Sequence, residues 1–401
     1  MSQKLNLRNN SFFNQLRIRD ANSACSNDRL IEKSTINVLM FGPALSEQGG
    51  MGSVQRLSIE HAPKELNIKH ITTWNGKSNT FVLFYKASVI FLLRLFQHRV
   101  DIVHIHVSER GSVVRKLILA LIAFAWSKPV IMHTHGCEFH LFFDSLPKFA
   151  RQLISKIWQG CDRTLVLSKS WQQIYIDKLQ LPPHKVLVRY NPVDVPKHIA
   201  AHTSSDRIKF ILLGKVARRK GVFDLLEAVS QLSLDYQDKI GLTIAGNGKV
   251  EEAIALAKEL QIESLVNVIG WVDRQQCDRL LEEADVFVLP SYNEGLPMAL
   301  LEAMSFRLPV ITTPVGGIPE IIIDRENGLS ILPGKIEELV NAIQTLVDNE
   351  SLRLKLGSAA YERAKLLDIE NYIRDLFEIY YSVLEDSSKL KLSPQNDSNL
   401  N

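Results

Sequence analysis

The chain is poor in cysteine and has no long apolar run, and its first residues are polar; we expect each of these features to exclude a class of protein. Its four cysteines show no C-x-x-C spacing, which argues against a disulfide scaffold and fits a reducing cytoplasm. The most apolar run, residues 117–126, has only about half the length that crosses a bilayer. Residues 1–33 are polar and lack the apolar core of a signal peptide, so we expect a flexible extension there.

Charge is spread unevenly along the chain. Residues 1–200 contain 26 Lys and Arg against 13 Asp and Glu, whereas residues 201–401 contain 21 against 31. A basic half suits an anionic membrane, an anionic acceptor or nucleic acid, and an uneven solvated surface is the plain alternative. No recognisable nucleic-acid module accompanies the basic half, so we expect no nucleic-acid partner.

Short β-branched runs alternate with longer amphipathic ones in two series, which is typical of parallel sheets covered by helices. A chain of 401 residues also exceeds what one compact core usually holds. We therefore predict an α/β protein made of two doubly wound, Rossmann-like domains facing across a cleft. The expected parts are domains over 34–190 and 208–368, a linker over 191–207, a helix over 369–386 that crosses to the first domain, and a disordered tail over 387–401.

The segment SYNEGLPMALLEAMSF, residues 291–306, follows a predicted strand at the edge where open α/β sheets bind ligands. Pro297 suits the first position of a helix, whose free amides near its start can bind an anion. Glu294 and Glu302 are too far apart to share a proton, but they can each accept hydrogen bonds from hydroxyls at opposite ends of one ligand. The alternative interpretation is that Glu294 is an acid near the start of a helix and Glu302 is an acid on the surface of that helix.

Three further segments gather glycines or cations at predicted turns. The glycine loop over 42–54 lacks the G-x-G-x-x-G spacing of a dinucleotide site and has no P-loop lysine, yet its glycines allow a phosphate or sugar to approach the backbone. The turn GKVARRKG, residues 214–221, gathers four cations where a helix begins, which is unfavourable unless an anion lies between them. A second glycine turn, VGGIPEII, covers residues 315–322 and precedes a predicted helix. We interpret its Glu320 as an acid at the start of that helix.

Four histidines alternate on two predicted strands, His104 with His106 and His133 with His135. A zinc site is the weaker interpretation, because no cysteine or carboxylate spacing supports it and strand histidines are often hydrogen-bonded core residues. We expect no metal. Trp271 either stacks on a base or packs in the core.

These motifs, taken in order over roughly residues 35–385, resemble the retaining GT-B glycosyltransferases of the E-x7-E type, which are glycosyltransferase family 4 and glycosyl transferases group 1. The resemblance implies transfer of a sugar from a nucleoside diphosphate sugar without a metal or other cofactor. It assigns catalytic roles to His135, Lys220 and Glu294. The donor-binding residues that it implies are Gly50, Met51, Lys215, Arg218, Gly295, Leu296, Met298, Ala299 and Glu302.

Within that assignment, Glu302 would hold the ribose hydroxyls and Glu294 the sugar hydroxyls, while His106, His133 and Glu138 are candidates for the acceptor side. Lys215 stands where the family has an arginine, which keeps the charge and loses the bidentate geometry. That change leaves open a nucleotide-sugar-binding protein with impaired catalysis. An epimerase of the same fold is the other alternative.

The acceptor is expected to be a glycan or a lipid-linked sugar of the cell envelope. The segment over 81–99 is strongly apolar with interspersed cations, as in helices that lie on anionic membranes. A core helix covering the sheet is the competing interpretation. We accordingly expect a cytoplasmic protein that contacts the inner face of the membrane peripherally.

Overall fold

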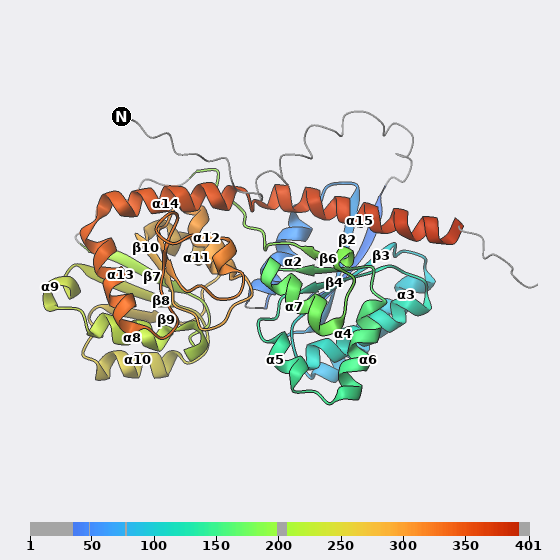
Figure 1. Ribbon diagram of the computed structural model, residues 1–401, viewed down its shortest axis with the longest axis horizontal. Helices are drawn as coiled ribbons and strands as arrows, with labels where there is room; N and C mark the ends of the chain where they lie inside the picture. The colour runs from blue at the N-terminus through green and yellow to red at the C-terminus, as the bar shows by residue number, and fades with distance from the viewer. Residues whose placement is uncertain (1–34, 48, 77, 199–206, 393–401) are drawn as a thin grey trace, which may run out of the picture.

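The computed structural model describes residues 35–47, 49–76, 78–198 and 207–392, and Figure 1 shows them as two lobes joined along one side by a long helical stretch. The extension expected over residues 1–33 lies outside the described residues. Each lobe holds a parallel sheet of six strands with helices on both faces. The predicted pair of doubly wound α/β domains is thereby confirmed.

The amino-terminal domain has the strand order β2-β1-β3-β4-β5-β6. Its strands are β1 (Ile36–Pro43), β2 (Leu66–Trp74), β3 (Ile102–Val107), β4 (Val130–Thr134), β5 (Arg163–Val166) and β6 (Val186–Val188). Its helices are α2 (Gly50–Glu60), α3 (Thr80–Phe96), α4 (Gly111–Ala125), α5 (Phe139–Asp144), α6 (Lys148–Gln159), α7 (Lys169–Leu179) and the 3-10 turn η1 (Pro183–Lys185). Every residue of β3 and β4 is buried, because a parallel sheet is covered on both faces.

Alternation along these strands separates two cores. Leu39 and Phe41 face the side covered by α3, α4 and α6, whereas Val38 faces the side covered by α2 and α15. The histidines of β3 and β4 share the second side, since His104 contacts Tyr380 of α15. The strand pattern therefore points the histidine row away from the three helices of the first side.

The carboxy-terminal domain has the strand order β12-β11-β10-β7-β8-β9. Its strands are β7 (Ile208–Leu213), β8 (Ile240–Ala245), β9 (Val266–Ile269), β10 (Val286–Leu289), β11 (Val310–Thr312) and β12 (Leu329–Ser330). Its helices are α8 (Val222–Ser230), α9 (Leu234–Gln237), α10 (Val250–Glu259), α11 (Arg274–Glu283), α12 (Met298–Ser305), α13 (Ile336–Asp348) and α14 (Glu350–Lys365), with 3-10 turns η2 (Arg218–Lys220) and η3 (Ile318–Glu320). Its own core lies chiefly between the sheet and helices α8, α10 and α13.

The last helix, α15 (Ile369–Leu392), leaves the carboxy-terminal domain and packs on the amino-terminal sheet (Figure 1). Arg189 at the end of β6 fixes it, with Nη1 2.7 Å from Asp375 Oδ2 and Nη2 2.9 Å from the Tyr372 carbonyl oxygen. The helix extends beyond residue 386, so the tail that we expected over 387–401 is corrected for residues 387–392. Ser387 and Ser388 donate to carbonyl oxygens one turn earlier, which their short side chains allow inside a helix.

Candidate functional site

Glu294 lies in the turn between β10 and α12, at the carboxyl end of the second sheet, and is only 5% exposed. Its Oε1 accepts hydrogen bonds from Lys220 Nζ at 2.6 Å and from Ser291 Oγ at 2.7 Å. Arg219 Nη1 lies 3.7 Å from its other oxygen. A buried carboxylate needs such partners, because burial without them costs several kcal/mol. Cations and an acid therefore meet at one buried point.

The turn that follows β7 places Lys220 there. Gly221 has φ +69°, and a Cβ at this position would lie 2.1 Å from the Pro290 carbonyl oxygen. Only glycine lets the chain pass so close to the end of β10 in this left-handed conformation. Gly221 therefore places the preceding residue, Lys220, next to the turn that contains Glu294.

The structure brings Arg219 to this point and leaves the two other predicted cations outside it. Arg218 extends to solvent, 3.3 Å from Glu252, and Lys215 is exposed. Arg219 Nη1 instead donates to the Asn293 carbonyl oxygen and lies beside Glu294. Consecutive residues of a 3-10 turn point about 120° apart, so adjacent arginines cannot face the same side. The sequence shows the run of cations and gives no signal for which arginine turns inward.

Glu302 lies within α12 and is 9% exposed. Its Oε1 accepts a hydrogen bond from Arg274 Nη1 at 2.9 Å, and Arg274 also pairs with Asp278. Burial raises the pKa of Glu302, and the charge of Arg274 partly opposes that rise. Arg274 stands 28 positions earlier on α11, and no local pattern in the sequence links the two residues.

The start of α12 joins the predicted residues of both domains. A Cβ on Gly50 would lie 3.0 Å from Cγ of Met298, and a Cβ on Gly295 would lie 3.5 Å from the His135 carbonyl oxygen. Met51 follows Gly50 in the first turn of α2 and is half-buried. The glycine loop, the strand-end histidine and the E-x7-E segment therefore converge where the two domains touch.

Structural support for this segment comes from one asparagine and one glycine. Asn191 Nδ2 donates to the Leu296 carbonyl oxygen at 2.7 Å, and Ala299 follows in the first turn of α12. A Cβ on Gly316, where φ is +58°, would lie 1.8 Å from the Glu294 carbonyl oxygen. The loop over 315–322 thus packs directly on the Glu294 turn. First-turn amides of α12 have no partner within the helix and are available to an anion.

The four histidines form a row that ends at the junction between the domains. His106 Nδ1 and His135 Nε2 are 2.8 Å apart, and His104 Nδ1 lies 2.6 Å from the Tyr380 hydroxyl. Burial lowers the pKa of both His104 and His135 to about 3, so each is neutral at neutral pH. His135 can therefore act through a hydrogen bond and not through a positive charge.

His104, His106 and His133 bring ring nitrogens within 4.8 Å of one another. Zinc–nitrogen bonds of about 2.0–2.1 Å require nitrogens that converge on one point. The ring plane of His104 instead lies within 18° of the planes of His106 and His133, so the ring of His104 stacks on both of them. The donor set has the right chemistry for a metal, but its stacked geometry does not favour one, and the absence of a metal stays a prediction.

Trp271 follows β9 and is 54% exposed, so the interpretation as a buried core residue is wrong. Its position at the carboxyl end of a strand is the edge where such sheets bind ligands. Glu138 is half-buried beside β4.

Two family models match the chain. Residues 53–197 match the model described as Glycosyltransferase Family 4, and residues 194–363 match the one described as Glycosyl transferases group 1.

Among curated proteins, an uncharacterized glycosyltransferase of Haemophilus influenzae is 28% identical over 227 residues, which are 56% of this chain and 61% of that protein. The match thus spans less than two thirds of that relative. An Escherichia coli protein named UDP-Gal:alpha-D-GlcNAc-diphosphoundecaprenol alpha-1,3-galactosyltransferase is 27% identical over 285 residues, 67% of this chain and 72% of that protein.

Among solved structures, Anabaena HepE in complex with UDP and glucose superposes with a TM-score of 0.69 at 16% identity, covering 86% of this chain and 100% of that one. At this identity the likeness concerns the fold. The two family models together span residues 53–363. The chain thus matches the Glycosyltransferase Family 4 model in its amino-terminal part and the Glycosyl transferases group 1 model in its carboxy-terminal part, and its two parallel-sheet domains have the fold of the GT-B glycosyltransferases.

Proposed function

We propose that the protein transfers a sugar from a nucleoside diphosphate sugar to a glycan or lipid-linked acceptor, with retention at the anomeric carbon and without a metal. One observation carries this proposal: Lys220 and Arg219 flank the buried Glu294 beside the free amides at the start of α12. Cations and helix-start amides stabilise a leaving diphosphate as negative charge builds on it. The buried acid accepts hydrogen bonds from sugar hydroxyls.

The reaction breaks the bond between the anomeric carbon and the diphosphate oxygen, whose electron pair leaves with the diphosphate. The acceptor hydroxyl attacks the same face of the sugar within the resulting ion pair, and its proton passes to the departing phosphate. Lys220 holds Glu294 in the described state. An incoming diphosphate competes for that ammonium, which frees Glu294 Oε1 for the sugar. His135, neutral and close to Gly295, supplies a hydrogen bond near the reacting carbon.

Glu302 is assigned to the ribose hydroxyls. A screen of nucleoside diphosphates by thermal shift tests the assignment, because a ligand at a hundred times its Kd stabilises the folded state by about 2.7 kcal/mol. We expect one nucleotide to raise the melting temperature of the wild type and to leave that of Glu302→Ala unchanged. Glu326→Ala, which removes an exposed acid of the same domain, is the matched control and should respond as the wild type does. Equal stabilisation of Glu302→Ala would remove the ribose assignment.

The Escherichia coli relative carries a lipid-linked acceptor in its name, which supports an acceptor of that class and a role in cell-envelope polysaccharide or glycolipid synthesis on the cytoplasmic side. Product analysis separates the alternatives. Incubation of the preferred donor without an acceptor should leave the sugar unchanged, whereas an epimerase would convert it. Addition of a membrane extract should then yield a glycosylated lipid or glycan. A binding protein without catalysis would give no product in either case.

A further inference from the structure

Three neighbouring helices of the amino-terminal domain, α3, α4 and α6, expose a large apolar surface. Large apolar side chains that are exposed number 23 among the described residues, and twelve of them belong to these helices. They are Phe81, Val82, Tyr85, Val89, Ile90, Leu93 and Phe96 on α3, Val114, Ile118 and Leu121 on α4, and Phe149 and Leu153 on α6. Contiguous apolar surface of this kind marks an interaction site.

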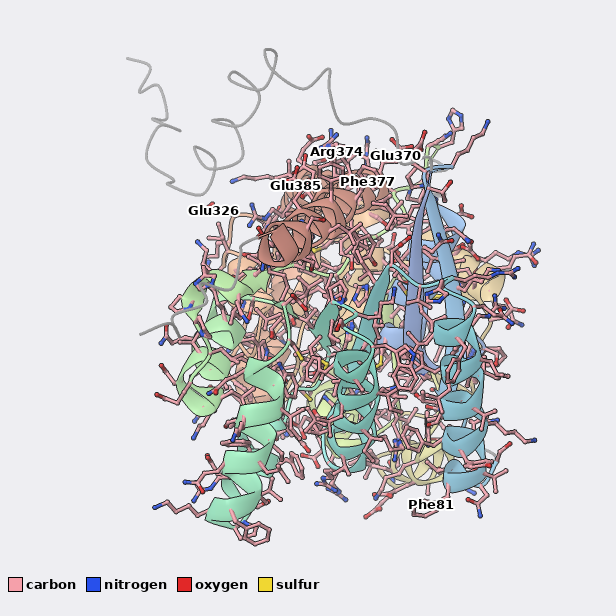
Figure 2. All side chains as sticks on the ribbon, turned by 90° about the vertical axis from the view of Figure 1, so that its right-hand side faces the viewer. Phe81, Glu326, Glu370, Arg374, Phe377 and Glu385 are labelled. Atoms are coloured by element: carbon pink, nitrogen blue, oxygen red, sulfur yellow. The ribbon has the colours of Figure 1, made fainter. Side chains whose placement is uncertain are left out.

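Only one stripe of residues along α3 packs in the hydrophobic core. Ala87, Phe91 and Leu95 recur at helical spacing and are buried against the sheet, whereas Phe81 is 84% exposed. The core-helix interpretation of residues 81–99 thus explains one stripe and leaves the rest without a partner in the described chain. Figure 2 shows Phe81 at the end of the domain opposite α15, on which Phe377 and Glu385 lie.

The charge on these helices has a single sign. None of the three contains an aspartate or glutamate. Their cations, apart from the buried Lys116, are Lys86 and Arg94 on α3, Arg115 on α4, and Lys148, Arg151 and Lys156 on α6. Lys116 does not belong to this surface, since it is 2% exposed and donates to Thr73 Oγ1. An apolar surface with cations and no acids is complementary to anionic lipid.

A pocket of about 290 Å³ lies at the border of this surface, between β2 and α3. Three cations line it, Lys69, Lys86 and Arg94, together with apolar groups of Leu83 and Ile90. A phosphate headgroup joined to an acyl chain presents the matching chemistry, an anion beside apolar carbon.

We propose that the α3–α4–α6 surface docks on an anionic phospholipid bilayer, with a lipid phosphate in the pocket between β2 and α3. Among the described residues, no helix combines the length and apolarity needed to pass through a membrane, so the contact is peripheral. Helices that follow parallel strands begin at the carboxyl edge of the sheet, which is the edge that carries His135 and Gly50. The docked surface therefore adjoins the reaction site, and a lipid-linked acceptor reaches it without leaving the bilayer.

Flotation with vesicles tests the surface, using vesicles of phosphatidylglycerol with phosphatidylcholine and vesicles of phosphatidylcholine alone. We expect the full chain to float with the anionic vesicles and not with the neutral ones. Lys86→Ala/Lys148→Ala should partition about thirtyfold more weakly, since each cation near an anionic surface contributes about fivefold. Phe81→Ser/Phe149→Ser should lose at least tenfold, because roughly half of each exposed ring would enter the interface. The matched control, Leu234→Ser/Leu354→Ser, removes two exposed apolar groups from the other domain and should bind as the wild type does.

Three results would overturn the inference: no flotation of the wild type, unchanged flotation of both surface variants, or a wild-type dimer that Phe81→Ser/Phe149→Ser converts to a monomer in light scattering. The last result would show that a second copy covers the surface. The inference deepens the proposed function by naming where its acceptor resides, yet vesicle binding needs no donor. Nucleotide-dependent stabilisation of the same variants should be unchanged, so failure of the docking surface and failure of the donor site are measured separately.

Discussion

Tyr190 of the amino-terminal domain donates its hydroxyl hydrogen to Glu320 of the carboxy-terminal domain at 2.8 Å. The same carboxylate accepts the backbone N–H groups of Lys169 and Ser170, at 3.0 and 3.1 Å. These amides belong to the first turn of α7, where a negative charge is stabilising. Glu320, which we considered as an acid at the start of its own helix, therefore caps a helix of the other domain and ties the two domains together beside the site.

Removal of this carboxylate should loosen the domain junction. Glu320→Ala leaves two α7 amides and the Tyr190 hydroxyl without their charged acceptor, and we expect the free energy of unfolding to fall by about 2 kcal/mol. Tyr190→Phe removes one of these bonds and should cost less. Urea unfolding measures both, with the exposed acid replaced in Glu326→Ala as the control. A loss in the control as large as that in Glu320→Ala would contradict this account.

The two adjacent arginines of η2 should differ in their effect on donor binding. Arg219 lies against Glu294, whereas Arg218 points to solvent. We expect Arg219→Gln to weaken nucleoside diphosphate binding by roughly tenfold, the value of a charged hydrogen bond, and Arg218→Gln to weaken it less. Isothermal titration calorimetry of both variants measures the order, and the reverse order would show that the donor draws Arg218 into the site.

Acid should destabilise the protein through His104 and His135 of the histidine row. The pKa values of His104 and His135 are lowered from 6.5 to about 3 by burial, so between these values the unfolded chain binds more protons than the folded one. Stability is then complete above pH 6.5 and falls as the pH drops below it, by about 1.4 kcal/mol per pH unit for each histidine.

The measurement is the melting temperature between pH 4 and 8. In His104→Gln, the melting temperature should fall less steeply below pH 6.5 than in the wild type. The difference is the contribution of one histidine, because the glutamine amide binds no proton in this pH range. His184→Gln, which replaces an exposed histidine, should keep the wild-type slope. If the melting temperature of His104→Gln falls as steeply with acid as that of the wild type, the histidine row is not the cause of the acid destabilisation.

Metal removal should leave transfer unchanged. In the proposed donor site, Lys220 and Arg219 beside Glu294 supply the positive charge that a metal brings to a diphosphate elsewhere. The ring of His104 stacks on the rings of His106 and His133. We expect the purified protein to contain less than about one tenth of an equivalent of zinc by elemental analysis, against the single ion that one site holds. Loss of activity in EDTA that zinc or magnesium restores would overturn the expectation.

Much of the fold could be predicted because parallel strands buried on both faces leave a local signature. Runs such as VFVL at β10 are continuous, apolar and buried. The edge strand β2, with the sequence LNIKHITTW, lacks this signature because polar residues interrupt the apolar run. We predicted the end of α15 too early because the serines and lysines there have the composition of a disordered tail. Serine hydroxyls can, however, donate hydrogen bonds to backbone carbonyl oxygens within a helix.

The site could be predicted in part. The glycine turns and the segment around Glu294 and Glu302 can be recognised from local sequence, because a turn at a strand end needs particular residues within a few positions. Arg274, Arg219 and Glu320 act on groups far away in the chain, and no local pattern marks them.

By itself the sequence determined two parallel-sheet domains, the order of the glycine, lysine and glutamate motifs, and the edge of each sheet that carries them, because backbone conformation and burial periodicity depend on neighbouring residues. Only the tertiary structure decided which cation meets Glu294, which domain Glu320 caps and which face of α3 stays uncovered. Those outcomes depend on how two separately folded surfaces dock, and side chains that meet there come from segments with no fixed spacing in the chain.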